Sequence, residues 1–298
     1  MPSLERLLAG PHDVVAVISQ PDRRRGRGRK LSPSPVAEVA QREGLPLLRP
    51  ERVGAPEVEA ELRRCAPDLG VVAAFGQFLP KRIRELPAKG YLINGHASLL
   101  PRHRGAAPIQ RAILAGDSVT GVSIMRIERE MDAGPVALTR ETAIGPDENA
   151  GELATRVASL TAEALAEAVD RIADENVSWT PQDGAAATMA PKIERAEAAL
   201  DWSEAAEMLL RRVRALAPTP GAFTLLEREP LRILSAHALP GPVTATPGSV
   251  RRDDETSLQV ATCDGWLIPL RLQRAGGKAL ETADFLRGRP IPDGITLG

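Results

Sequence analysis

An asparagine and a histidine stand two residues apart where an apolar run ends, at Asn94 and His96. The run Tyr91–Asn94 (YLIN) predicts a buried strand, and residues i and i+2 of a strand point to the same side. An asparagine amide can stabilise a developing oxyanion, and an imidazole can act as a general acid or base. The pair predicts a catalytic centre at the carboxyl end of this strand, where open α/β sheets bind their ligands.

Asp132 is the natural third member of this centre, in the turn Met-Asp-Ala-Gly-Pro at 131–135. A carboxylate beside a histidine orients the imidazole and stabilises its charged form. The alternative is a turn-forming aspartate without a catalytic role, because Asp is common in turns. Local sequence favours neither interpretation, and we expect Asp132 to face the same site as Asn94 and His96.

A strongly basic segment, Gln20–Lys30 (QPDRRRGRGRK), follows another apolar run and carries six positive residues against one negative. One interpretation is a solvated surface loop. The other is an arm that contacts phosphates and orders on binding RNA. The segment is not a dinucleotide fingerprint, because its Gly-x-Gly lacks the third glycine and the apolar start of a helix.

The whole chain of 298 residues is nearly neutral, with 38 Lys plus Arg and 39 Asp plus Glu. This balance excludes a uniformly basic nucleic-acid-coating protein, and a hydrophobic content of 43% excludes a disordered polyelectrolyte. Two distant cysteines, Cys65 and Cys263, predict neither a disulfide framework nor a metal site. Without a signal peptide or a bilayer-length apolar run, we expect a cytoplasmic protein with no membrane contact.

Short apolar runs alternate with helical patterns up to about residue 175. The runs at 14–19, 68–75 and 91–94 predict buried strands, and residues 151–175 predict the clearest amphipathic helix. This order predicts an α/β domain with a Rossmann-like, doubly wound, mostly parallel sheet. Such a domain normally opens with a strand, but residues 3–8 already predict a helix, so the first strand is expected to be missing.

The periodic pattern is lost after Val177, and turn-forming residues at 179–187 predict a linker. A short helix over 201–216 and several short strands with turn signals then predict a small antiparallel β-barrel. The predicted domains are therefore a catalytic domain at 1–177, a linker at 178–198 and a barrel domain at 199–298.

The segment SLLPRHRGAAPIQ at 98–110, preceded by Asn-x-His and followed by the Asp132 turn, resembles the signature of 10-formyltetrahydrofolate-dependent formyltransferases. More narrowly, the chain resembles the methionyl-tRNA formyltransferase family over essentially its whole length. The motifs that carry this likeness are QPDRRRGRGRKLSPSPV (20–36), TGVSIM (120–125), APKI (190–193), DWS (201–203) and RALAPTPGAF (214–223).

The resemblance implies formyl transfer from 10-formyltetrahydrofolate to the α-amino group of methionine on initiator tRNA, without a metal, by a cytoplasmic monomer. It implies that Asn94, His96 and Asp132 are the catalytic trio, and that the second domain is an OB-like barrel that assists tRNA binding. The implied folate-contacting residues are Ser98, Leu99, Leu100 and Pro101. The implied tRNA-binding residues are Arg23, Arg24, Arg25, Arg27, Arg29 and Lys30 in the basic segment, and Arg211, Arg271 and Lys278 in the barrel domain, with Arg212, Arg214 and Arg274 as further candidates.

The chain also departs from this family. The family begins with a strand and a Gly-Thr-Pro loop, so we expect a late start codon or a shortened chain. Gly95 replaces an apolar residue, and a strand glycine is expected to loosen the backbone that aims Asn94 and His96. Residues 199–298 are neutral, with 12 basic and 12 acidic residues. Two alternatives stay open: a formyltransferase for a nucleotide-linked amino sugar, and a non-catalytic RNA-binding protein on a decayed enzyme scaffold.

Overall fold

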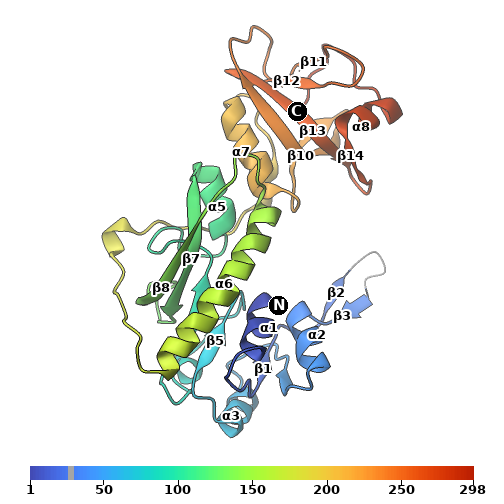
Figure 1. Ribbon diagram of the computed structural model, residues 1–298. Helices are drawn as coiled ribbons and strands as arrows, with labels where there is room; N and C mark the ends of the chain where they lie inside the picture. Colours follow the sequence, from blue (N-terminus) through green and yellow to red (C-terminus); the bar gives the residue numbers. More distant parts are fainter. Residues whose placement is uncertain (26–29) are drawn as a thin grey trace. The chain divides into compact units, whose positions relative to one another are not determined.

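The computed structural model describes residues 1–25 and 30–298 and divides the chain into two compact units. Unit 1 comprises Met1–Gly105, Thr120–Thr142 and Arg156–Met189, and unit 2 comprises Ala106–Val119, Ala143–Thr155 and Ala190–Gly298. Figure 1 labels most of their helices and strands. The units do not follow the predicted boundaries, because unit 2 includes two segments of the first 177 residues. The domains at 1–177 and 199–298 and the linker at 178–198 stay predictions.

The sheet structure of unit 1 confirms the α/β prediction and, apart from a two-stranded hairpin described below, falls into two parts. β1 (Val17–Ile18) pairs in parallel with β4 (Leu47–Leu48). A second sheet has the order β5 (Gly70–Val72), β6 (Leu92–His96), β7 (Val119–Arg126) and β8 (Val136–Ala143). In this second sheet, β5 and β6 are parallel, whereas β6 and β7 are antiparallel. Within the described chain, no strand pairs with the other edge of β1 or of β5.

The helices of unit 1 begin where the sequence supplies a suitable first turn. α1 (Pro2–Leu8), α2 (Pro35–Arg42) and α3 (Pro56–Cys65) each start with proline, whose fixed φ suits the first helical position. The Ser34 hydroxyl caps α2 by accepting a hydrogen bond from the Ala37 amide at 3.1 Å. A short α4 (Lys81–Arg84) follows β5.

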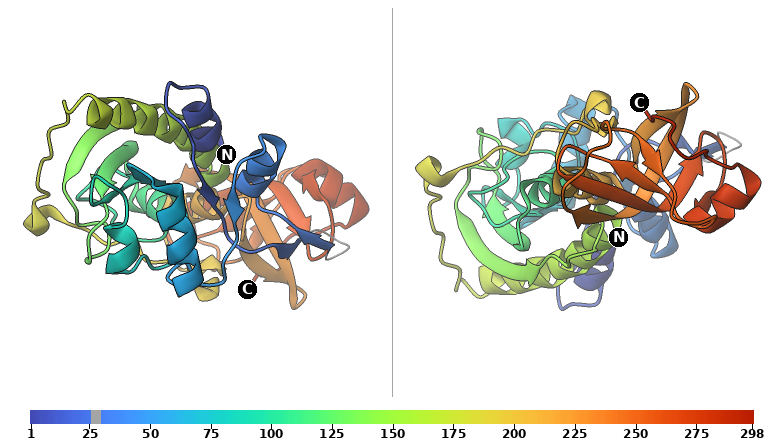
Figure 2. Two further views of the ribbon diagram at one scale, coloured as in Figure 1. Left: turned by 90° about the horizontal axis from the view of Figure 1, so that it is seen from below. Right: turned by 90° about the horizontal axis from the view of Figure 1, so that it is seen from above.

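The long helix α6 (Ala150–Ala173) covers one face of the four-stranded sheet (Figure 2). Its residues Leu165, Val169 and Ile172 pack with Ile93 of β6 and with apolar side chains of β7 and β8. The amphipathic pattern of the sequence thus predicts this helix and its buried face. Burial of these side chains fixes β6, the strand that carries Asn94 and His96, against a rigid support.

Unit 2 contains a curled antiparallel sheet in the order β11-β12-β13-β10-β9, with β14 paired to β13, as expected for an OB-like half-barrel. The strands are β9 (Ala222–Leu226), β10 (Glu229–Pro240), β11 (Val250–Arg251), β12 (Gln259–Ala261), β13 (Gly265–Arg274) and β14 (Ala279–Glu281). The helices are α5 (Pro108–Ala115), α7 (Ala206–Leu216) and α8 (Thr282–Gly288). The register of β10 against β13 shifts around Ser235, which bends the sheet.

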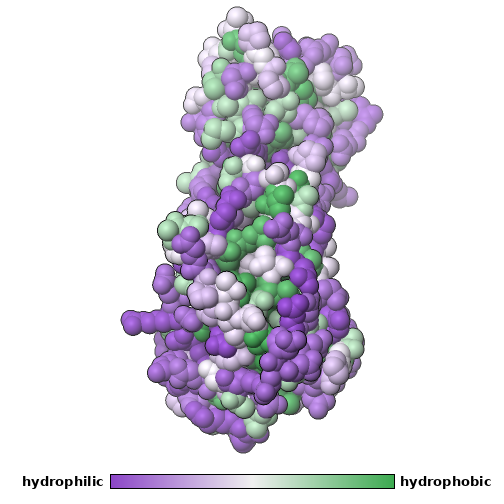
Figure 3. Space-filling model, turned by 60° about the vertical axis from the view of Figure 1, so that its left-hand side comes forward, coloured by the Kyte–Doolittle hydropathy of each residue, from purple (hydrophilic) through white to green (hydrophobic). Residues whose placement is uncertain are grey.

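The core of unit 2 forms where α7 packs against β10 and β13 of this sheet. Leu209 and Val213 of α7 join Ile233 of β10 and Leu267 of β13, all fully buried. Trp202 lies in the same core, and its indole N–H donates to the Thr224 hydroxyl at 3.1 Å. Outside the cores, hydrophilic side chains are interspersed with apolar patches on the face drawn in Figure 3. None of the described helices is long and apolar enough to span a bilayer.

Candidate active site

Asn94 and His96 end strand β6, as their spacing predicted. The register of β6 against β7 pairs Asn94 with Met125 and His96 with Ser123. The two side chains are two residues apart on one strand and so point to the same side. His96 is 6% exposed, whereas Asn94 is half-buried. The Asn94 amide makes no hydrogen bond with the described residues, so its N–H groups are available to a substrate.

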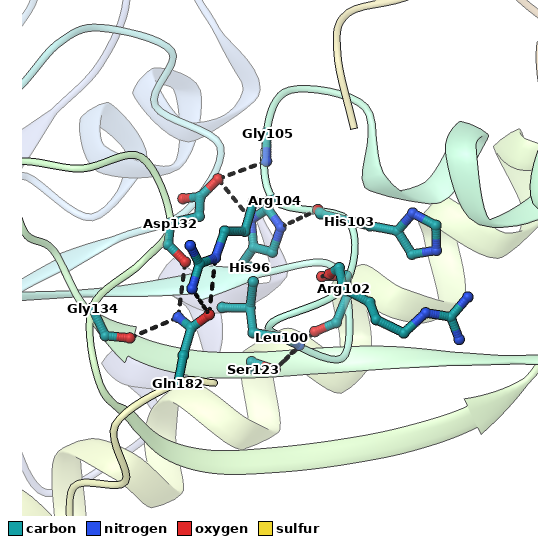
Figure 4. Close-up of polar contacts among 11 residues, drawn as sticks. His96, Leu100, Arg102, His103, Arg104, Gly105, Ser123, Asp132, Gly134 and Gln182 are labelled. Atoms are coloured by element: carbon teal, nitrogen blue, oxygen red, sulfur yellow. Dashed lines mark hydrogen bonds and ion pairs between the residues drawn. The ribbon is translucent and has the colours of Figure 1, made fainter. Parts of the chain in front are cut away.

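Both ring nitrogens of His96 have polar neighbours (Figure 4). Nε2 lies 2.9 Å from the carbonyl oxygen of His103, and Nδ1 lies 3.5 Å from Oδ2 of Asp132. A carbonyl oxygen only accepts, so Nε2 must carry a hydrogen. In the neutral ring, Nδ1 is then the nitrogen without a hydrogen, and it faces the carboxylate.

Asp132 lies in the turn after β7 and has a positive φ of 52°. Its Oδ2 also accepts a hydrogen bond from the Gly105 amide at 2.9 Å, which fixes the carboxylate beside His96. Gly134 follows two residues later, where any Cβ would clash with the carbonyl oxygen of Arg126. A glycine is thus required for the turn to return close to the end of β7. The structure brings His96 and Asp132 together as the sequence predicted.

Gly95 between the two catalytic candidates has a packing role. A Cβ on Gly95 would lie 2.5 Å from Cγ2 of Thr161 and 3.3 Å from Cδ1 of Leu165, both on α6. The absent side chain lets α6 pack directly on the backbone of β6. The expectation that this glycine loosens the strand stays a prediction, and side chains of α6 occupy the place that a side chain at Gly95 would take.

The predicted folate segment follows β6 directly, and its residues have different surroundings. Ser98 is fully buried, and its hydroxyl donates to the Arg102 carbonyl at 2.6 Å. The Ser123 hydroxyl of β7 donates to the Ser98 carbonyl at 2.8 Å and accepts from the Leu100 amide at 3.0 Å. Leu99 is half-buried. Ser98 therefore shapes the segment from inside.

A cavity of about 350 Å³ lies beside this segment in unit 1. Leu100 and Pro101 line it, together with residues 136–139 of β8 and residues 180–183. Of the predicted folate contacts, Leu100 and Pro101 thus line the cavity, whereas Ser98 is buried and supports the segment from within. Their assignment to folate stays a prediction.

The basic segment begins and ends as a β-hairpin of β2 (Arg23–Arg25) and β3 (Lys30–Ser32). The side chains of Arg23 and Arg24 are exposed, and the single acidic residue, Asp22, is paired with Arg49 at 2.8 Å. Arg23 and Arg24 therefore present positive charge that no acidic side chain among the described residues pairs with. Of the other predicted tRNA contacts, Arg27 and Arg29 lie outside the described residues, and the side chains of Arg25 and Lys30 are not described.

The predicted tRNA contacts of unit 2 differ in how they are paired. Lys278 is exposed and has no partner in the part of the chain that the structure describes. Arg211 is 3.3 Å from Glu207, and Arg271 is 4.0 Å from Glu281, both surface pairs of small energy that a phosphate could replace. The three further candidates have shorter contacts. Arg274 lies 3.1 Å from Glu229, and Arg212 lies 2.9 Å from Glu204. Arg214 donates to the carbonyls of Gly145 and Glu148.

Arg214 is the least suited of these to bind a phosphate. Burial lowers the pKa of its guanidinium, and both of its hydrogen bonds go to backbone carbonyls of unit 2. It is placed to join α7 to the turn before α6. The role of Arg211, Arg271 and Lys278 in tRNA binding stays a prediction.

Three residues near the trio were not singled out by their sequence pattern: Arg104, Gly105 and Gln182. Gly105 holds the Asp132 carboxylate through its amide, and Gln182 joins Arg104 to the Asp132 turn. A backbone amide leaves no signal in residue type. Gln182 lies in a segment without periodicity, so nothing local marked it.

No group of three or more His, Cys, Asp and Glu side chains within residues 1–25 and 30–298 is arranged to hold a metal ion. Asn94, His96 and Asp132 offer an amide, an imidazole and a carboxylate. Such a set suits general acid–base catalysis with stabilisation of an oxyanion.

Two family models match this chain. The family model described as formyl transferase matches residues 3–169, and that described as formyl transferase, C-terminal domain, matches residues 192–290. Methionyl-tRNA formyltransferase from Chromobacterium violaceum is 44% identical over 297 residues, which cover 99% of this chain and 95% of that protein. The chain belongs to the methionyl-tRNA formyltransferase family. The relative from Methylococcus capsulatus, of the same name, is 45% identical over 98% of this chain and 94% of its own.

Solved structures confirm the formyltransferase fold. The N-formyltransferase from Helicobacter canadensis, in complex with folinic acid and dTDP-3-aminofucose, superposes with a TM-score of 0.66 at 15% identity and covers 92% of this chain and 94% of that one. HypX from Aquifex aeolicus, in complex with tetrahydrofolic acid, gives 0.61 at 21% identity over 84% of this chain, which spans 43% of HypX. Methionyl-tRNA formyltransferase from Clostridium thermocellum gives 0.52 at 14% identity, over 67% of this chain and 86% of that one.

Proposed function

We propose that this protein transfers the formyl group of 10-formyltetrahydrofolate to the α-amino group of methionine carried by initiator tRNA. The observation that carries the proposal is the 44% identity, over 99% of the chain, to a methionyl-tRNA formyltransferase. The arrangement at the end of β6 supports it independently, because His96 and Asp132 adjoin and Asn94 leaves its amide unused.

In this mechanism the neutral α-amino group attacks the formyl carbon, and the carbonyl becomes a tetrahedral oxyanion. The side-chain amide of Asn94 stabilises that oxyanion, and the imidazole of His96 adds to this once Nδ1 is protonated. The new C–N bond makes the amine acidic, and the departing folate nitrogen must gain a proton. His96 accepts the proton at Nδ1, where Asp132 stabilises the imidazolium, and the proton passes to the leaving nitrogen, directly or through water.

The folate is proposed to lie against Leu100 and Pro101, supported from beneath by Ser98 and Leu99. The reaction as written uses no metal, since acid–base and oxyanion chemistry complete it. Because the substrate is an aminoacyl-tRNA, we place the enzyme in the cytoplasm, where it acts as a monomer without membrane contact.

The tRNA would be held by positive charge in two places. In unit 1 these are Arg23, Arg24, Arg25, Arg27, Arg29 and Lys30 of the basic segment, and in unit 2 they are Arg211, Arg271 and Lys278. Exposed, uncompensated guanidinium groups at Arg23 and Arg24 support the first group. Phosphate contacts of this kind supply affinity by releasing counterions.

A formyltransferase for a nucleotide-linked amino sugar is less supported. The sugar enzyme from Helicobacter canadensis shares the fold at 15% identity, far below the 44% of the tRNA enzyme. A non-catalytic RNA-binding role is also less supported, because the acid–base pair of His96 and Asp132 is intact.

A substrate comparison tests the proposal. The purified chain is given radiolabelled 10-formyltetrahydrofolate and one of three acceptors: initiator Met-tRNA, elongator Met-tRNA or a dTDP-amino sugar. We expect rapid formylation of initiator Met-tRNA and at least a hundredfold lower kcat/KM for the sugar, about 2.7 kcal/mol of discrimination. Transfer to the sugar at an equal rate, or folate binding without transfer, would overturn the proposal.

A further inference from the structure

Gln182 makes a full set of hydrogen bonds beside the catalytic trio, although its segment was expected to be a linker (Figure 4). Its Oε1 accepts from Nε and Nη2 of Arg104 at 3.1 and 2.8 Å. Its Nε2 donates to the carbonyl oxygens of Asp132 and Gly134 at 2.8 and 2.7 Å. Both donors and both acceptor positions of the amide are therefore used.

These bonds join the two pieces of chain that hold His96. One piece is the segment 103–105, which offers the His103 carbonyl to Nε2 and the Gly105 amide to the Asp132 carboxylate. The other is the turn 131–135, which supplies the carboxylate beside Nδ1. Arg104 belongs to the first piece, and the carbonyls of Asp132 and Gly134 belong to the second. Gln182 bonds to both pieces, beside the Gly105–Asp132 hydrogen bond and an ion pair at 3.7 Å between Arg104 and Glu130.

The segment that carries Gln182, residues 180–189, is itself fixed at both ends in unit 1. Thr180 exchanges two backbone hydrogen bonds with Val136 of β8, at 2.8 and 2.9 Å. Thr188 accepts from the Arg104 amide at 2.8 Å through its carbonyl and from the His103 amide at 2.9 Å through its hydroxyl. Hydrogen bonds at Thr180 and Thr188 therefore fix the backbone that carries Gln182.

Two features of the groups bonded to Gln182 call for neighbours that hold them in place. Asp132 has φ of 52°, a conformation that non-glycine residues adopt rarely and hold only when neighbours fix it. Arg104 is 7% exposed, and a buried guanidinium needs acceptors for its N–H groups. Gln182 supplies acceptors to Arg104 and donors to the Asp132 turn at once.

We propose that Gln182 is a positioning residue for formyl transfer, which sets the distance between the Asp132 carboxylate and Nδ1 of His96 and so controls proton transfer. The inference rests on the proposed function. Gln182 does not reach the reacting atoms, and its effect passes through Asp132. Its loss should thus lower kcat while the KM values for folate and tRNA stay nearly constant.

The test uses Gln182→Glu, which still accepts from Arg104 but no longer donates to the two carbonyls. We expect kcat to fall about 10- to 100-fold, by analogy with the hydrogen-bond partners that orient metal-ligating side chains, with both KM values within threefold. The matched control is Gln273→Glu on β13, because Gln273 also accepts from an arginine, Arg232, and donates to a carbonyl, that of Gly277. The control should leave kcat within twofold.

A double-mutant cycle with Asp132→Asn separates positioning from general damage. If Gln182 acts through Asp132, the double variant with Gln182→Glu and Asp132→Asn has a kcat less than threefold below that of Asp132→Asn alone. The inference would be overturned if the two single-variant decreases in kcat multiplied in the double variant, or if Gln182→Glu left kcat unchanged. A wild-type chain that fails to formylate Met-tRNA would refute the proposed function instead. Far-UV circular dichroism and the Tm of each variant show that it folds.

Discussion

Replacing Gly95 by alanine would force one methyl group between β6 and α6. The new Cβ would lie 2.5 Å from Cγ2 of Thr161, whereas ordinary contacts begin at 3.4 Å. Strand and helix must therefore separate by about 1 Å, and overpacking of this kind costs roughly 1–3 kcal/mol of stability. For a unit of this size we expect the Tm to fall by about 2–12 °C.

The same displacement moves Asn94 and His96, which flank Gly95 on the strand. A misplacement of about 1 Å at reacting groups costs on the order of 10²-fold in rate. We therefore expect kcat for formyl transfer to fall about 10- to 100-fold in Gly95→Ala at a temperature where the variant is folded. The assays are thermal unfolding followed by circular dichroism and steady-state formylation of Met-tRNA.

Thr161→Ser is the matched second change, because it removes Cγ2 and keeps the hydroxyl that donates to the Val157 carbonyl at 2.7 Å. Thr161→Ser alone should cost about 1 kcal/mol for one buried methyl group. In the double variant it should restore part of the stability and activity, and Leu165 at 3.3 Å keeps the rescue incomplete. The reasoning is refuted if Gly95→Ala matches wild type in Tm and kcat, or if Thr161→Ser deepens its defect.

Two further predictions concern charge. Arg23→Ala with Arg24→Ala should weaken tRNA binding and flatten the slope of log K against log salt by about 0.7–0.9 per lost phosphate contact. As a control, Arg63→Ala with Arg64→Ala on α3 removes the same charge and should leave the slope unchanged. An equal slope for wild type and both double variants would exclude phosphate contacts by Arg23 and Arg24. In unit 2, the hydrogen bond from Arg111 lowers the pKa of Glu197, so its stabilisation is present at neutral pH and is lost as pH falls below about 4.3. Glu197→Gln should therefore reduce the drop in Tm between about pH 5 and pH 3, and an unchanged drop would contradict this pairing.

The sequence predicts the parts of the site that follow from local periodicity. Asn94 and His96 could be placed because a strand has a period of two and its end is marked by a change from apolar to polar residues. The buried face of α6 could be predicted from its apolar spacing. Asp132 could be nominated by residue type, although its approach to His96 depends on the fold.

The remaining parts depend on contacts between distant segments. Gln182 acts 50 residues beyond Asp132, and its polar neighbours signal only a turn-rich segment. Gly95 looks like a weak point in a strand until α6 is packed against it. The division into units 1 and 2 could not be predicted from the order of the sequence either, because each unit consists of three separate segments.

The central claim is that the amide, imidazole and carboxylate at the end of β6 carry out formyl transfer to Met-tRNA. The most direct measurement is the single-turnover rate of that transfer for wild type, Asn94→Ala and His96→Ala, with tRNA and folate both saturating. Loss of one oxyanion donor should lower the rate by about 10²–10³-fold in each variant, with folding unchanged. Rates within threefold of wild type in both variants would contradict the claim.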